Sequence, residues 1–383
     1  MNSRFRQGTR LESVQTGDQV VLASVLGTGG ESTVFACKKA PRIAVGIPHE
    51  MNAEKLNRLH FLQAWRPAIA TQKHFAWITD LVQDESGRVV GFTMPKVDGE
   101  ELATYTSPQT RPTTATYLFL LKVFRSLASG VHGAHASGYC VGDLNEFNVS
   151  IRGEEAVILD VVSFSVHHRN CIFNTPVGVG EYLPPELQAA HAAGALGSQQ
   201  RTVHGDSFSF AIMFWKCLMN GFHPFSSREL IPIEEAIREK QWPHSSVSKL
   251  HPKSACPPIT NLPTSLAVLF RQCFGVGLDD PLARPLILDW YREIDLVVQE
   301  EERASKKRPA AKVAAAQVSN SIGAGTLAAV AVSVAVGVGL LSTSTSFSFV
   351  PREKDGKATS QKKLDTPKLW KSIKSFPRQG EDQ

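Results

Sequence analysis

The chain lacks the cysteine patterns that build metal or disulfide sites. Its 383 residues contain six cysteines, and no two of them form a CxxC pair. We therefore expect neither a zinc site nor a disulfide framework, and we expect reduced thiols in a cytosolic domain. The first 21 residues contain no apolar run of the kind that signal peptides have, so no signal peptide is expected.

A strong charge of one sign is also missing. The chain has 41 basic and 36 acidic residues, and its net charge of +5 is too mild to indicate a nucleic-acid surface. No compact basic patch interleaved with aromatic residues occurs in the first 300 residues. We therefore expect no nucleic-acid partner. The length suffices for a two-lobed domain with an appendage.

The order of apolar segments predicts an α+β fold. Short apolar runs broken by turns predict strands between residues 20 and 100, with one helix over 50–65 among them. Apolar residues at helical spacing predict a helix over 113–138, and a strand pair over 149–151 and 157–159 follows it. A loop to about residue 183 comes next, and helices separated by proline-rich breaks then continue to about residue 300. A small β-rich lobe and a larger helical lobe are expected.

The last ninety residues differ in composition from the domain before them. Residues 297–320 read as a basic linker, and residues 343–383 as a polar, lysine-rich tail. Between them, 321–342 is uncharged and has about the 20 apolar residues that a membrane-spanning helix needs. An uncharged linker is the alternative. Five basic residues at 303–312 precede the span, so the positive-inside rule places the preceding domain in the cytoplasm.

A glycine-rich segment, LGTGGESTVF at 26–35, joins two predicted strands. Glycines let backbone amides approach phosphate groups closely, but an ordinary hairpin turn explains the same residues. A strand on both sides argues against a dinucleotide-binding fold, in which a helix follows the glycines. The segment alone therefore leaves a phosphate loop and a plain turn open.

Three polar residues interrupt apolar surroundings further along the chain. Asp143 and Asn148 lie in VGDLNEFNVSI, and Asp160 ends the apolar run VILD. Aspartate and asparagine are common in surface turns, which is the simpler interpretation. However, the hairpin predicted between Asn148 and Asp160 would bring all three side chains together. Their oxygens beside a glycine-rich loop are suited to a magnesium–nucleotide complex.

The order of these motifs resembles the protein-kinase family over residues 20–296. The later motifs that match are GVGEYLPPEL with Glu186, HGDSFSFAIMFWKCLMNGFHPF with Asp206, and ARPLILDWYREI with Arg284. The sequence is most similar to bacterial kinases of the tellurite-resistance-associated type. That resemblance implies a von Willebrand A protein and a PP2C-type phosphatase as partners. Residues 1–19 would be an N-terminal extension.

The resemblance also implies roles for individual residues. Asp143 corresponds to the catalytic aspartate that accepts the proton of the substrate hydroxyl, and Asn148 and Asp160 to the two ligands of Mg²⁺ or Mn²⁺. The implied ATP contacts are Gly27, Thr28, Gly29 and Gly30 at the phosphates, and Val34, Ala44, Met94 and Val97 around the adenine. Glu54 corresponds to the glutamate of the first helix in the small lobe. Glu186 and Arg284 would form a buried pair, and Asp206 would hold the catalytic loop.

Departures from the family pattern concern the phosphates and the activation segment. Gly46 occupies the position of the phosphate-binding lysine in RIAVGI. Lys38 or Lys39 on the preceding strand is the candidate replacement, and a solvated hairpin is the simpler interpretation of both lysines. Val141 and Gly142 replace the His-Arg that precedes the catalytic aspartate. Phosphorylation of the activation segment, which follows Asp160 and contains Ser163, Ser165 and Thr175, is therefore not expected to be needed.

The sequence leads to a membrane-anchored kinase that uses ATP and a divalent cation to phosphorylate serine or threonine in a protein substrate. The retained Asp143, Asn148 and Asp160 favour this function. Because Gly46 replaces the lysine, the alternative is a weak or inactive pseudokinase that binds nucleotide or a partner protein. A small-molecule kinase is a third possibility on the same fold.

Overall fold

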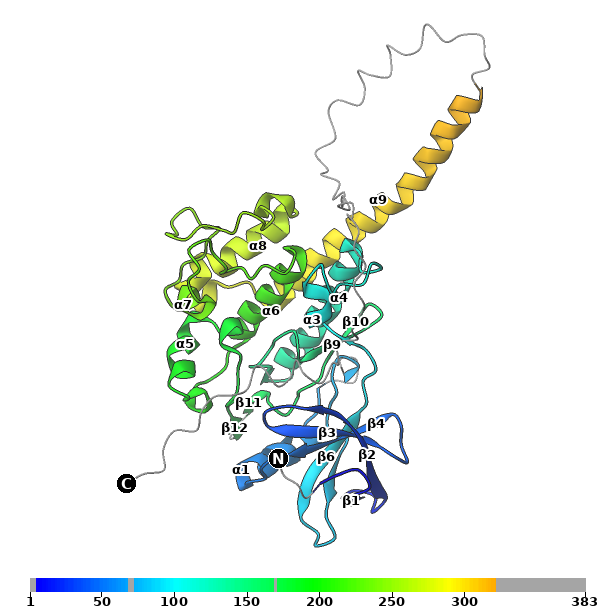
Figure 1. Cartoon of the computed structure of the whole chain (residues 1–383), viewed down its shortest axis with the longest axis vertical. Helices are drawn as coiled ribbons and strands as arrows, with labels where there is room; N and C mark the ends of the chain where they lie inside the picture. Colours follow the sequence, from blue (N-terminus) through cyan, green and yellow to red (C-terminus); the bar gives the residue numbers. More distant parts are fainter. Residues whose placement is uncertain (1–4, 68–71, 169–170, 322–383) are drawn as a thin grey trace, which may run out of the picture. The chain divides into compact units, whose positions relative to one another are not determined.

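In the computed structural model of the protein, residues 5–67, 72–168 and 171–321 are described, except for the side chains of 167, 168, 171 and 307–321 (Figure 1). The chain forms two compact units, Met1–Glu301 and Glu302–Gln383. All sites considered below belong to the first unit.

Six antiparallel strands close into a barrel in the order β1-β2-β3-β4-β6-β5. Their bounds are β1 Arg10–Ser13, β2 Gln19–Thr28, β3 Ser32–Cys37, β4 Ile43–Pro48, β5 Asp80–Gln83 and β6 Val89–Pro95. Strand β1 pairs with both β2 and β5 and so completes the ring. The extension expected over residues 1–19 therefore contains a strand of the domain. With only four residues, β1 is too short for its alternation to predict it.

Helix α1, Ala53–Ala64, packs beside the barrel, as Figure 1 shows. It is shorter than the predicted 50–65 because Asn52 caps it: the side-chain oxygen of Asn52 accepts a 2.8 Å hydrogen bond from the Lys55 amide. Leu59 and Leu62 are fully buried and fix the helix against the core. The position of α1 matters because its first turn lies next to the glycine-rich turn.

The larger lobe is mainly helical. Its helices are α3 Ala103–Thr106, α4 Tyr117–Ala136, α5 Pro185–Ala192, α6 Val203–Leu218, α7 Ile233–Arg238, α8 Thr264–Phe274 and α9 Ile287–Ser321. Aromatic rings of four helices pack together: Phe124 stacks on Phe214 at 4.6 Å between ring centroids, and Phe270 lies 4.9 Å from Trp290. These fully buried rings form a rigid base for the loops above them.

Two small sheets carry the loops of the candidate site. One contains β7 Glu100–Glu101, β9 Val149–Arg152 and β10 Glu155–Ile158, and the other β8 Tyr139–Cys140, β11 Ser165–His168 and β12 Cys171–Phe173. The hairpin predicted over 149–151 and 157–159 is present as β9 and β10. The hairpin of β11 and β12 lies where the sequence predicts a loop.

Helix α9 continues through the whole of the predicted basic linker, 297–320, and ends at Ser321. Its apolar positions Trp290, Ile294, Val297 and Val298 are buried in the first unit. None of the helices within residues 5–67, 72–168 and 171–321 is long and apolar enough to cross a bilayer. Apart from Ser321, the span predicted over 321–342 lies outside the described residues and stays a prediction.

Candidate active site

The glycine-rich segment is a tight turn between β2 and β3. Gly27 pairs with Val34, and Thr28 with Thr33, so the turn comprises residues 29–31. The Gly29 amide donates to the Ser32 carbonyl at 2.8 Å. A β-carbon at Gly27 would meet no atom within 4 Å, which leaves open space at this end of the hairpin. The geometry is that of a hairpin whose exposed backbone can approach a phosphate group.

Residues predicted around the adenine lie on neighbouring strands. Val34 of β3 pairs with Gly46 of β4, and Ala44 of β4 pairs with Met94 of β6. Val97 follows two residues after the end of β6. The barrel therefore brings these residues onto adjacent strands beyond the glycine-rich turn.

Asp206 holds the loop that carries Asp143. Its two carboxylate oxygens accept hydrogen bonds from the amides of Val141 and Gly142 at 2.7 and 2.8 Å, and one also contacts His135 Nε2 at 2.9 Å. Asp206 is 2% exposed, so α6 and the loop form one buried unit. This is the role that the sequence comparison with kinases predicts for Asp206.

Asp143 has both carboxylate oxygens engaged by amides. Asn145 Nδ2 donates to Oδ1 at 2.9 Å, and Asn148 Nδ2 donates to Oδ2 at 3.3 Å. Burial raises the pKa of Asp143, against the opposing effects of Asn145, the Val179 amide, Asn148 and Arg201. A fixed carboxylate with a raised pKa is suited to orient a hydroxyl group and accept its proton. The position of Asn145, two residues after Asp143, was the signal available in the sequence for this contact.

Asp160 completes the cluster with Asn148 and Asp143. The Leu159 amide donates to the Asn148 carbonyl at 2.9 Å, which places Asp160 next to Asn148. Asp160 is exposed, yet neighbouring protein groups displace part of its hydration. This desolvation, together with the charge of Asp143, raises the pKa of the Asp160 carboxyl group to about 6. The structure thus brings together the three residues that the sequence singled out.

This cluster fits a divalent cation only if other ligands join it. Both hydrogen bonds of the Asn148 amide use Nδ2, so Oδ1 remains available as a ligand beside the Asp160 carboxylate. No group of three or more His, Cys, Asp or Glu side chains able to hold a metal occurs among the described residues. Mg²⁺ is commonly held by one or two protein ligands together with substrate phosphates, and the donor set matches that pattern.

Gly46 cannot be replaced by a lysine without moving the core. A β-carbon there would overlap the Phe92 ring, with two ring carbons at 2.8 Å. Phe92 lies opposite Gly46 on β6 and is 4% exposed. The aromatic ring therefore fills the space through which a lysine side chain would leave the strand.

Lys38, predicted as the replacement, is not brought to the cluster. It is exposed and follows the end of β3 that is opposite the glycine-rich turn. Because a strand advances about 3.3 Å per residue, Lys38 lies roughly 20 Å along the strand from Ser32. Lys39 donates to Gln19 at 3.0 Å on the same outer hairpin. The reach of a lysine side chain is too short to close this distance.

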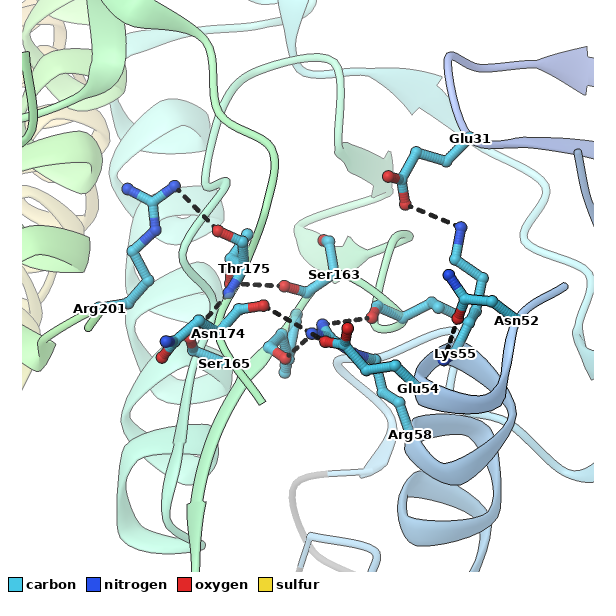
Figure 2. Close-up of polar contacts among 12 residues, drawn as sticks. Glu31, Asn52, Glu54, Lys55, Arg58, Ser163, Ser165, Asn174, Thr175 and Arg201 are labelled. Atoms are coloured by element: carbon cyan, nitrogen blue, oxygen red, sulfur yellow. Dashed lines mark hydrogen bonds and ion pairs between the residues drawn. The ribbon is translucent and has the colours of Figure 1, made fainter. Parts of the chain in front are cut away.

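Helix α1 presents Lys55 to the glycine-rich turn and Arg58 to the activation segment (Figure 2). Glu54 is 71% exposed in its side chain and lies 4.0 Å from Arg58. Arg58 is buried and donates to the carbonyls of Val162, Phe164 and Asn174 at 3.2, 3.3 and 2.6 Å. One turn earlier, Lys55 Nζ lies 3.5 Å from Glu31 of the glycine-rich turn. The signal in the sequence was helical spacing, because Lys55, Arg58, Leu59 and Leu62 share one face.

Arg201 occupies the volume beside Gly142. Gly142 has a φ of +73°, and a β-carbon on it would overlap Thr175 and approach Arg201 Cγ at 3.1 Å. Arg201 donates to the Val177 carbonyl at 2.8 Å, and its charge favours the ionised form of Asp143. The arginine missing from the chain before Asp143 is thus replaced in space by one from the segment before α6.

The activation segment is held by buried hydroxyl groups. Thr175 Oγ1 donates to the Ser163 carbonyl at 2.6 Å, and Ser165 Oγ accepts from the Thr175 amide at 3.1 Å. Ser163, Ser165 and Thr175 are all buried. Glu186, in the segment that follows, accepts two 2.7 Å hydrogen bonds from Arg284, so the predicted pair is present. The pair is not buried as predicted, because the Glu186 side chain is 36% exposed whereas that of Arg284 is fully buried.

Comparison with known proteins agrees with this geometry. No model of a known protein family matches the chain. It is 30% identical over 308 residues to "Protein kinase YegI" of Escherichia coli O157:H7, which covers 76% of this chain, and 29% identical over 303 residues to the protein of the same name from strain K12, which covers 74%. The chain spans 46% of each relative, about half of their length.

A solved structure shows the same fold. The "ROP18 kinase domain in complex with AMP-PNP and sucrose" superposes with a TM-score of 0.53 at 17% identity, covering 78% of this chain and 86% of that one. None of these proteins is named as a tellurite-resistance-associated kinase, so the resemblance to that type stays a prediction. A chain that aligns with named protein kinases over most of its length, and that folds as a kinase domain does, belongs to the protein-kinase-like superfamily.

Proposed function

We propose that the chain is a protein kinase that transfers the γ-phosphoryl group of ATP to serine or threonine hydroxyls of a protein substrate. The observation that carries the proposal is the cluster of Asp143, Asn148 and Asp160, joined by the hydrogen bond from Asn148 to Asp143 and by the electrostatic influence of Asp143 on Asp160. A module that only binds partners has no need of all three groups in this arrangement.

Each residue of the cluster has a distinct task in the proposed reaction. Asp143 orients the substrate hydroxyl and accepts its proton, while Asn145 and Asn148 fix the carboxylate. Asn148 and Asp160 are the residues that would hold Mg²⁺ or Mn²⁺. The bound cation would supply neutralisation of phosphate charge during transfer. The glycine-rich turn covers the phosphates with backbone amides.

A pseudokinase is the second candidate, and the site of the missing lysine favours it. Gly46 has no side chain to contact phosphate, and the Phe92 ring prevents one from being accommodated. Such a protein would bind nucleotide or a partner without transferring phosphate. An active kinase and a nucleotide-binding pseudokinase would both bind Mg²⁺·ATP, and thermal-shift titration with Mg²⁺·ATP tests for that binding. Transfer of labelled phosphate by the wild type, but not by Asp160→Ala, separates them.

Membrane attachment through residues 321–342 is part of the proposal. Its support is the uncharged apolar sequence and the basic residues before it, which favour a single pass with the kinase-like domain in the cytoplasm, where ATP is available. A von Willebrand A protein and a PP2C-type phosphatase are the proposed partners, on the basis of sequence resemblance alone.

A further inference from the structure

Phosphate transfer requires a cation to balance the charge of the nucleotide, and β4 supplies none at Gly46. Helix α1 offers two cationic side chains near the site: Lys55 contacts Glu31 of the glycine-rich turn, and Arg58 interacts electrostatically with Asp160. Lys55 and Arg58 are three residues apart and therefore lie on the same helix face. Figure 2 shows Lys55 directed toward Glu31 and Arg58 directed toward Asn174, with Glu54 beside the Arg58 guanidinium.

Arg58 is already committed to structural contacts. Its guanidinium donates to three backbone carbonyls of residues 162–174, and its side chain is 6% exposed. Turning it toward a nucleotide would leave these carbonyl oxygens without their donor, which is costly in a buried site. Arg58 is thus a fixed link between α1 and the activation segment, and the flexible cation is Lys55.

Lys55 is held loosely and in a favourable place. Its ammonium group is 3.5 Å from Glu31, and the two side chains are 20% and 42% exposed, so solvent screens the pair. Glu31 directly follows the glycines of the turn, and its charge also acts on Asp160. The pair therefore joins α1 to the glycine-rich turn, and its acidic member lies close enough to Asp160 to act on it electrostatically.

We propose that Lys55 of α1 binds the nucleotide phosphates in place of the lysine absent from β4. In the absence of nucleotide, Glu31 is its counter-ion. When ATP binds, the phosphate oxygens take the place of the Glu31 carboxylate at the ammonium group. The proposal rests on the proposed function, because it assumes that the site accepts ATP. The lysine that binds the phosphates would thus come from a helix instead of a strand.

The test compares two ligands that differ only in phosphate. The full chain and its variants are titrated with Mg²⁺·ATP and with adenosine, and binding is measured by calorimetry. Lys55→Ala should weaken ATP binding roughly 10- to 100-fold, the usual effect of losing a charge-assisted hydrogen bond, and leave adenosine binding unchanged. Lys55→Arg should retain most of the ATP affinity.

Lys122 provides a matched control. It lies on α4, its side chain is 18% exposed, and its Nζ lies 3.2 Å from Glu154, so Lys122→Ala removes a comparable ion pair away from the cluster. Glu31→Gln supplies a test of sign: because it removes a competing carboxylate, ATP should bind at least as tightly as to the wild type. A merely structural role for the Lys55–Glu31 pair predicts weakening from both changes.

The outcomes distinguish this inference from the proposed function. If the wild type binds ATP and Lys55→Ala binds it equally well, Lys55 is not the phosphate ligand. If the wild type binds no Mg²⁺·ATP, both the function and this inference are overturned. Melting temperatures of the apo proteins show whether each variant is folded, and Lys55→Gln serves as a second variant should Lys55→Ala be unfolded.

Discussion

At the scale of single residues, the raised pKa of Asp160 should make the proposed binding of nucleotide depend on pH. The pKa is about 6 instead of the ordinary 3.8 because nearby protein groups reduce the hydration of the carboxylate and because the negative charges of Asp143 and Glu31 oppose its ionisation. The folded state therefore holds this proton more tightly than the unfolded state does. Through this group, the free energy of unfolding falls as pH rises from 3.8 to about 6 and is constant above that.

Metal binding requires the ionised carboxylate, so acid should oppose it. We expect the affinity for Mg²⁺·ATP to fall roughly tenfold between pH 7 and pH 5, as one proton competes with the cation. Calorimetry at both pH values measures this change. Asp160→Asn is the control, because the nucleotide's own titration affects both proteins equally. The affinity of this variant for Mg²⁺·ATP should be weaker and should change less between pH 7 and pH 5. If the wild type bound Mg²⁺·ATP equally well at pH 5 and pH 7, Asp160 would not be a ligand of the metal.

Restoring the missing lysine should not help. Because the Phe92 ring occupies the adjacent space, Gly46→Lys should lower the free energy of unfolding by about 1–3 kcal/mol, as overpacking of a core does. It should not increase phosphate transfer. Thermal unfolding measures the first effect, and Gly27→Ala is a stability control because a β-carbon there meets no atom within 4 Å. A stable Gly46→Lys protein with faster phosphate transfer would contradict this prediction, because it would show that the site can accommodate and use a lysine at position 46.

The contrast between Glu54 and Arg58 shows what a sequence pattern can and cannot provide. Motif matching seeks a glutamate on the first helix and finds Glu54, which the structure leaves exposed. Helical spacing places Arg58 on the same face as Leu59 and Leu62, and the packing of α1 shows that this face is buried. Asp143, Asn148 and Asp160 could be predicted because each lies in a short local motif. Arg201 could not, since it reaches Gly142 from a distant segment.

At the scale of elements, the contacts of Arg58 predict that α1 stabilises the activation segment. Arg58→Met removes the donor for three carbonyls and should lower the free energy of unfolding by about 2–4 kcal/mol. Amide hydrogen exchange should accelerate in residues 162–174. Arg152→Met is the control, because Arg152 is largely exposed in its pair with Glu155 and such pairs contribute little. Unchanged exchange in 162–174 would mean that Arg58 does not hold the segment.

The elements themselves were predictable where their periodicity is long. Helix α4 and the strands β2, β3, β4 and β6 follow the sequence pattern closely. Strand β5 begins only at Asp80, whereas its apolar run begins at Phe75, because Phe75 instead forms a bridge with Ile158. The β11–β12 hairpin was missed, as its pairing with β8 depends on tertiary contacts.

At the scale of the whole molecule, the remaining prediction concerns the membrane. Residues 321–342 should hold the protein in the membrane fraction after carbonate extraction, because about 20 apolar residues suffice to span a bilayer. A variant that ends at residue 320 is the control and should be released. A C-terminal tag should be cleaved by external protease in spheroplasts. Complete release of the full chain by carbonate would exclude the membrane span. A tag protected from external protease would contradict the predicted topology, in which the C-terminal tail lies outside.

The central claim is that the cluster around Asp143 transfers phosphate although Gly46 provides no lysine. The most direct measurement follows labelled γ-phosphate from ATP into protein, with Mg²⁺ or Mn²⁺, for the wild type and Asp143→Asn. We expect transfer by the wild type and a decrease of roughly 10²- to 10⁴-fold in Asp143→Asn, the usual contribution of a general base, with Mg²⁺·ATP binding nearly intact. A folded wild type that binds Mg²⁺·ATP but transfers no more phosphate than Asp143→Asn would contradict the claim and leave a pseudokinase.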